Sequence, residues 1–197
     1  SQNTYQQLVK SLEQATSQAI EFRISETPVF IPTDLSQEIQ QTATALNQQL
    51  LTTEYLSASD RAIPANYCAP QQTPHPTFIQ TDFAIVRDEA GRLSPRLVEL
   101  QGCASIHAFQ LLLSQAYQQM FALSGVTYLL SGLNDKSYLD LLRRAIVGQH
   151  EPEQVVLMEI EPEQQKTLPD FVMTEKLLGV PTVAIHDIIK RGKKLFY

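Results

Sequence analysis

The sequence predicts an α/β fold with α+β character at the N-terminus. A pair of helices is expected to precede a central β-hairpin and a parallel, Rossmann-like sheet flanked by helices. Apolar residues recur at helical spacing in the first third of the chain, two strand-like runs flank a turn in the middle, and strand-like and helix-like segments alternate in the last third. Strands that alternate with helices call for right-handed crossovers, which is why the sheet is expected to be parallel.

Two polar helices are expected within an N-terminal helical segment, residues 1–57. Residues 4–20 carry apolar side chains near helical spacing, and a second helix begins at Thr33 or Asp34, which are both good N-caps. An apolar insert between the helices, residues 27–32, contains two prolines that end helices on either side. Because each helix has one narrow apolar stripe, we expect an antiparallel pair that rests on a larger core.

A proline-rich connection, residues 58–76, leads into the hairpin and has no periodic apolar pattern. Residues 77–86 and 95–100 are strand-like, and the run 87–92 between them is typical of a turn. The sequence therefore predicts a β-hairpin.

The hairpin and the Rossmann-like part together form a region, residues 77–197, that we expect to pack as one unit with the N-terminal segment. A helix directly follows the hairpin, and Gly179 ends a later one. The expected elements after the hairpin are a helix over 105–124, a strand over 127–130, a helix capped by Asn134 or Asp135, a strand over 155–160 covered on both faces, a helix over 168–178, and strands over 180–185 and 194–197.

Composition and charge exclude several classes of partner. The chain of 197 residues has a net charge of −6, which argues against the cationic face that nucleic-acid binding requires. Its basic cluster, residues 190–194, is interpreted as a solvated turn. No apolar run is long enough to cross a bilayer, and the N-terminus lacks the signal-peptide pattern. Since Cys68 and Cys103 cannot form a disulfide framework or a four-ligand zinc site, we expect reduced thiols in a cytoplasmic protein that binds neither nucleic acid nor membrane.

Four polar side chains in the hairpin are candidates for a metal site. Gln80 and Asp82 are two residues apart on the first strand, so they share one face of it. Glu99 and Gln101 have the same spacing on the second strand. If the register aligns the two faces, two carboxylates and two amide oxygens converge, and such an all-oxygen set suits Mg²⁺. The alternative is an exposed hairpin face with polar residues, although carboxylates within otherwise apolar strands are unusual.

Two runs around these residues are distinctive: QTDF at 80–83 and LVELQGCAS at 97–105. They resemble the circularly permuted ATP-grasp ligase family, the glutathionylspermidine synthase-like enzymes. In that family the first strand carries an Arg-x-Asp-Phe pattern, and the second carries Glu-Tyr-Asn before a turn of small residues. Asp82 and Glu99 match this pattern. Gln101 stands in place of the Asn and keeps an amide oxygen, whereas Gln80 stands in place of the Arg and removes a cation.

The resemblance implies binding roles for these residues and no catalytic residue. The ligands of the magnesium ions of ATP would be Asp82, Glu99 and Gln101. The cofactor-binding residues would be Gln80, Ser105 and His107. The last two lie at a helix start, which offers N–H donors to an anionic group.

The segment from residue 155 to the last residue resembles the Rossmann-like part that precedes the nucleotide-clamping half of these ligases. No lysine-bearing strands or glycine-rich loop of the kind that grips ATP are visible in the sequence. The resemblance therefore implies the N-terminal portion of an ATP-dependent carboxylate–amine ligase, whose parent enzyme would use Mg²⁺, ATP, a carboxylate and an amine. We expect this chain alone to be inactive and to bind no cofactor tightly. The alternative is a non-catalytic binding or assembly domain whose Gln-rich helices form a homodimer.

Overall fold

Two units make up the structure, a computed structural model that describes residues 2–68, 70, 73, 75–102 and 105–197. Residues 1–29 and 105–197 form the larger unit, and residues 30–104 form the smaller one. The sequence predicted a different division, with the N-terminal segment and the region 77–197 in one unit. The division differs because the first helix packs on helices from the second half of the chain, whereas the second helix packs on the hairpin.

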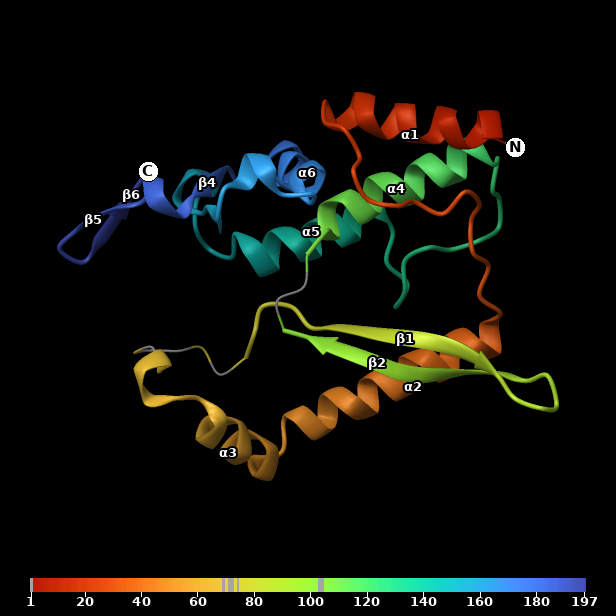
Figure 1. Ribbon diagram of the computed structural model, residues 1–197, viewed down its shortest axis with the longest axis horizontal. Helices are drawn as coiled ribbons and strands as arrows, with labels where there is room; N and C mark the ends of the chain where they lie inside the picture. The colour runs from red at the N-terminus through yellow and green to blue at the C-terminus, as the bar shows by residue number, and fades with distance from the viewer. Residues whose placement is uncertain (1, 69, 71–72, 74, 103–104) are drawn as a thin grey trace. The chain divides into compact units, whose positions relative to one another are not determined.

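In the larger unit, the described residues form four α-helices and four short strands (Figure 1). The helices are α1 (Gln2–Thr16), α4 (His107–Met120), α5 (Asp135–Ile146) and α6 (Leu168–Leu178). The strands are β3 (Leu157–Glu159), β4 (Thr182–Ala184), β5 (Ile189–Arg191) and β6 (Lys194–Phe196). Helix α5 starts where the sequence predicts, because the Asn134 side chain accepts a hydrogen bond from the Ser137 backbone N–H in a capping box.

The core of the larger unit lies where α1 crosses α4. Leu8 and Leu12 of α1 are fully buried and pack in one cluster with Ile24 and Phe109. Phe22 contacts the Phe109 ring edge to face, with 5.3 Å between the ring centroids. The apolar stripe of α1 is therefore covered within this unit. The predicted antiparallel pairing of the two N-terminal helices stays a prediction, because α1 and the next helix belong to different units.

A single parallel strand pair, β3 with β4, is found among the described residues, and α6 connects its two strands. Gly179 ends α6 with φ of 74°, as the sequence predicts. Residues 127–130 form no strand, since left-handed residues at Gly125 and Ser131 turn the chain on either side of them. Met158 in β3 is 52% exposed, so the prediction that this strand is covered on both faces is also wrong. The multi-stranded Rossmann-like sheet is reduced to one β-α-β element.

In the smaller unit a long helix lies beside a hairpin. Its elements are α2 (Thr33–Leu50), α3 (Thr53–Ala62), the 3-10 turn η1 (Ala65–Tyr67), β1 (Gln80–Arg87) and β2 (Leu93–Gln101). The predicted hairpin is confirmed: β1 and β2 pair antiparallel. The Asp88 carboxylate fixes the turn by accepting the Arg92 backbone N–H at 2.8 Å, and Gly91 adopts φ of 83° there.

Helix α3 occupies part of the stretch that the sequence predicts to be a loop. Thr52 caps the helix by accepting a hydrogen bond from the Tyr55 backbone N–H at 3.3 Å. Residues 58–62 are therefore helical. They belonged to the predicted proline-rich connection, residues 58–76, which is shortened by that much. None of the residues of α3 is buried, so no face of this helix packs on a core.

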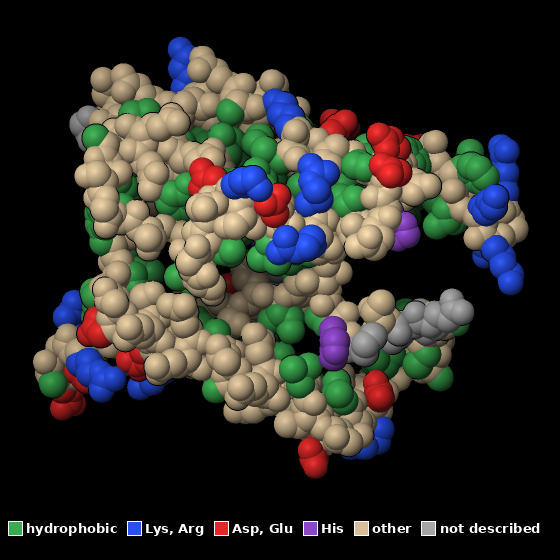
Figure 2. All heavy atoms as spheres, turned by 180° about the vertical axis from the view of Figure 1, so that it is seen from behind, with side chains coloured by type: hydrophobic (Ala, Val, Ile, Leu, Met, Phe, Trp, Pro, Cys, Tyr) green, Lys and Arg blue, Asp and Glu red, His purple; other side chains and the backbone are tan. Residues whose placement is uncertain are grey.

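The basic cluster at residues 190–194 lies at the tip of the β5–β6 hairpin, where Lys and Arg side chains gather in Figure 2. All its residues are exposed, and Gly192 makes the turn with φ of 63°. The interpretation of this cluster as a solvated turn is confirmed. None of the helices in the described parts of the chain has the length and apolar character to cross a membrane.

Truncation of Leu12 to alanine tests the core of the larger unit. We expect Leu12→Ala to lower the free energy of unfolding by about 2 to 5 kcal/mol, because it leaves a cavity in a closed cluster. Leu130→Ala is the matched control, since that leucine is 53% exposed and lies in the same unit. Urea denaturation of the two variants measures the difference, and equal losses of stability would contradict this description of the core.

Candidate functional site

The hairpin register brings four of the six predicted site residues together. Gln80 pairs with Gln101, and Asp82 pairs with Glu99. Residues directly opposite each other in an antiparallel ladder share a face, with Cβ atoms about 4.5 to 5.5 Å apart. The two carboxylates and two amides therefore lie on one face of the hairpin. The sequence predicted this convergence on the condition that the register aligns the two faces. Ser105 and His107 belong to the larger unit.

Each amide supports the carboxylate of its own strand. Gln80 Nε2 donates to Asp82 Oδ1 at 3.0 Å, and Gln101 Nε2 donates to Glu99 Oε1 at 3.0 Å. These hydrogen bonds orient both carboxylates and occupy one oxygen of each. Among the described residues, no donor reaches Asp82 Oδ2 or Glu99 Oε2. One free carboxylate oxygen on each strand is thus left for a ligand.

The two carboxylates repel each other across the hairpin. Asp82 lies directly opposite Glu99, and like charges in that position destabilise a strand pair. Neither carboxylate forms an ion pair with any residue that the structure describes. A hard divalent cation would relieve this repulsion, and oxygen donors of this kind are those that Mg²⁺ prefers.

The composition of the donor set limits which metal it suits. Within the described parts of the chain, no group of three His, Cys, Asp or Glu side chains converges. Two carboxylates from the hairpin are too few for a closed zinc site, which needs four nitrogen, sulfur or oxygen ligands. Mg²⁺ is commonly held by one or two carboxylates and completes its shell with water and phosphate oxygens. The hairpin residues fit Mg²⁺ in this respect.

A β-bulge lies next to the carboxylate pair. The ladder passes from the Asp82–Glu99 pair to the Phe83–Leu97 pair, so Val98 is an extra residue in β2. Without this bulge, strand alternation would place Arg96 and Glu99 on opposite faces, because they are three residues apart. The extra residue shifts the alternation by one and places Arg96, opposite Ala84, on the face of the carboxylates.

The start of α4, which the sequence predicts to bind a cofactor, donates backbone hydrogen bonds to a carboxylate from α6. Ile106 N donates to Asp170 Oδ2 at 3.0 Å, and Phe109 N donates to Asp170 Oδ1 at 2.8 Å. Asp170 thus acts as the N-terminal anion of α4, which has no side-chain cap of its own. These two donors are not available to a bound anion, and a role for Ser105 and His107 in cofactor binding stays a prediction. Cys103 and Ala104 lie outside the described residues.

Burial sets the protonation of this capping cluster. Burial raises the pKa of Asp170, and the N–H groups of Phe109 and Ile106 oppose that rise. Burial lowers the pKa of His107, against the attraction of the Asp170 carboxylate. The Tyr138 hydroxyl donates to the His107 carbonyl oxygen at 2.9 Å and ties α5 to the same point. The sequence analysis missed Asp170, although a carboxylate among the apolar residues of the 168–178 helix was a signal for it.

The chain matches no protein-family model, no curated protein and no solved structure.

The variant Asp170→Asn tests the role of the buried carboxylate. An asparagine turns an N–H₂ group toward one of the two backbone donors, so we expect a loss of about 1.5 to 3 kcal/mol in the free energy of unfolding. Asp187→Asn, at an exposed aspartate of the same unit, is the control and should change stability by less than about 0.5 kcal/mol. Urea denaturation of both variants measures the effect, and similar losses would contradict the assignment.

The raised pKa of Asp170 predicts that the stability of the folded chain depends on pH. Because burial raises the pKa of Asp170 above its usual 3.8, the folded chain binds this proton more tightly than the unfolded chain. The stability linked to that proton is present in full below pH 3.8 and is lost as the pH rises through the raised pKa. The stability of the parent chain relative to Asp170→Asn should therefore fall as the pH rises from about 4 to about 7. Denaturation midpoints across that range would show the trend, and an increase would contradict it.

Proposed function

We propose that the β1–β2 hairpin is the magnesium-binding element of an ATP-grasp-type carboxylate–amine ligase, to which this chain contributes its N-terminal portion. The observation that carries the proposal is the direct pairing of Asp82 with Glu99, each with one carboxylate oxygen free. Such a pair is unfavourable by itself and favourable around a divalent cation.

Asp82 and Glu99 would hold the cation, and Gln101 would add an amide oxygen once its side chain turns. A bound Mg²⁺ supplies positive charge that neutralises phosphate oxygens during phosphoryl transfer. The chain's own contribution is to orient the carboxylates, through the hydrogen bonds from Gln80 and Gln101, before a cation binds. Gln80 stands where the resembling family has a cation, so on this chain it orients Asp82.

The β3-α6-β4 element would be the core of the Rossmann-like segment. Its strands are parallel, with Leu157 opposite Thr182, and α6 forms the connection between them. Parallel strands in α/β proteins are normally covered on both faces, whereas Met158 is half exposed. In the proposed ligase this face would be covered by further structure, and the carboxylate and amine substrates would belong to the complete enzyme. Nucleotide binding by this chain alone should be weak, because the sequence carries no lysine-bearing clamp.

Titration of the chain with Mg²⁺ or Mn²⁺ tests the proposed cation site. We expect binding in the millimolar range or tighter, and we expect Asp82→Asn and Glu99→Gln each to raise the Kd about tenfold or more, because each removes a charged ligand. Isothermal titration calorimetry measures both constants.

Matched controls come from the same unit. Asp60→Asn and Glu89→Gln make the same chemical changes at exposed positions of α3 and the hairpin turn, and we expect them to leave the Kd unchanged. Weak binding that is equal in all five proteins would mean that the carboxylate pair holds no cation. The hairpin would then be an ordinary polar strand pair.

A further inference from the structure

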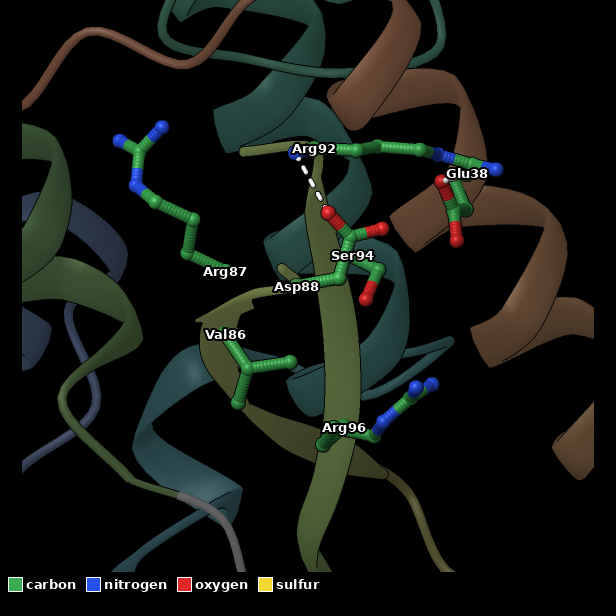
Figure 3. A pocket seen from close by; sticks show the side chains of 7 residues that line it. All are labelled: Glu38, Val86, Arg87, Asp88, Arg92, Ser94 and Arg96. Atoms are coloured by element: carbon green, nitrogen blue, oxygen red, sulfur yellow. Dashed lines mark hydrogen bonds and ion pairs between the residues drawn. The ribbon is translucent and has the colours of Figure 1, made fainter. Parts of the chain in front are cut away.

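A second set of charged side chains lies in the smaller unit, beside the hairpin turn. They line a pocket of about 400 Å³ between α2 and the hairpin. Its polar walls are three arginines, a serine and two acids: Arg87, Arg92, Arg96, Ser94, Glu38 and Asp88 (Figure 3). With three guanidinium groups against two carboxylates, this pocket carries excess positive charge in a chain whose net charge is −6.

Most of the charges in the pocket are already engaged. Arg92 Nη2 forms an ion pair with Glu38 Oε2 at 3.1 Å, and Asp88 Oδ1 accepts the Arg92 backbone N–H at 2.8 Å. Arg87 Nη1 donates to the Gly91 carbonyl oxygen at 2.8 Å. Both acids therefore have partners within the pocket, and neither pairs with Arg96.

Arg96 and Ser94 are the unengaged polar groups. Neither side chain has a hydrogen-bond or ion-pair partner among the residues that the structure describes. Figure 3 shows Arg92, Ser94 and Arg96 turned to one side of β2, toward Glu38, whereas Arg87 points away from them. Strand alternation explains the positions of Ser94 and Arg96, which are successive same-face positions of β2, and Arg92 lies in the turn just before that strand. A guanidinium and a hydroxyl on one face, with a second guanidinium beside them, are donors suited to an oxyanion.

We propose that Arg96, Ser94 and Arg92 form a binding site for a phosphate group. The bulge at Val98 places this site on the face of the Asp82–Glu99 pair, and Arg96 is opposite Ala84, two residues from Asp82. Same-face positions that are two residues apart on a strand are separated by about 7 Å. A ligand with more than one phosphate has the length to contact Arg96 while its other oxygens lie near the carboxylates. Such a ligand is favoured over a simple carboxylate, which would reach the arginines only.

The phosphate site does not depend on the cation site, and pyrophosphate binding without metal tests it separately. In magnesium-free buffer with a chelator, we expect Arg96→Gln to raise the Kd for pyrophosphate at least about tenfold, because a charge-assisted donor is lost. Arg61→Gln, at an exposed arginine of α3 in the same unit, should leave the Kd unchanged. Glu38→Gln should lower the Kd about threefold, since it removes a negative charge and frees Arg92.

Calorimetric titration of the full chain and its variants gives these constants. An equal effect of Arg61→Gln and Arg96→Gln, or no effect of Arg96→Gln, would overturn the phosphate site, because binding would then be diffuse or located elsewhere. Unaltered or weaker binding by Glu38→Gln would overturn it as well. Asp82→Asn separates the two proposals: it should not weaken metal-free pyrophosphate binding, and it should weaken Mg²⁺ binding. Pyrophosphate binding that requires Arg96 in a chain that binds no Mg²⁺ would refute the proposed function and support the phosphate site.

Discussion

The pairing of Asp82 with Glu99 across the hairpin is the constraint on which the functional conclusions depend. Two carboxylates directly opposite each other repel, and the amides of Gln80 and Gln101 offset only part of that cost by hydrogen bonding one oxygen on each. The ladder holds them in place because neighbouring backbone hydrogen bonds fix the register. One face of the hairpin therefore carries two oriented carboxylates whose repulsion a positive charge would reduce.

The bulge at Val98 determines which other side chains lie on the same face as the two carboxylates. It moves Arg96 onto the side of the carboxylates, whereas Leu97, which is opposite Phe83, lies on the other side. An acidic pair and a basic pocket therefore follow one another along the same strand surface. The two proposals rest on this arrangement: the cation site on the acidic pair and the phosphate site on the basic pocket.

The larger unit is organised around the start of α4 instead. That helix begins after Ile106, a left-handed residue, and its exposed N–H groups need an acceptor. Asp170 supplies it from α6, and the cost of burying this carboxylate is offset by hydrogen bonds to charged oxygens. One side chain thus connects two helices distant in sequence, beside the core of Leu8, Leu12 and Phe109.

Local signals in the sequence determined the elements whose ends depend on nearby residues. Asn134 caps α5, Gly179 ends α6, and the polar residues at spacing two are the ones that face each other across the hairpin. Local signals did not reveal α3, which is capped but has no buried face, or the absence of a strand over 127–130. Tertiary structure alone decided the register, the bulge, the capping of α4 by Asp170 and the segments against which α1 and α2 each pack. Each of these depends on which distant segment a residue meets, and side-chain periodicity along one segment carries no information about its partner.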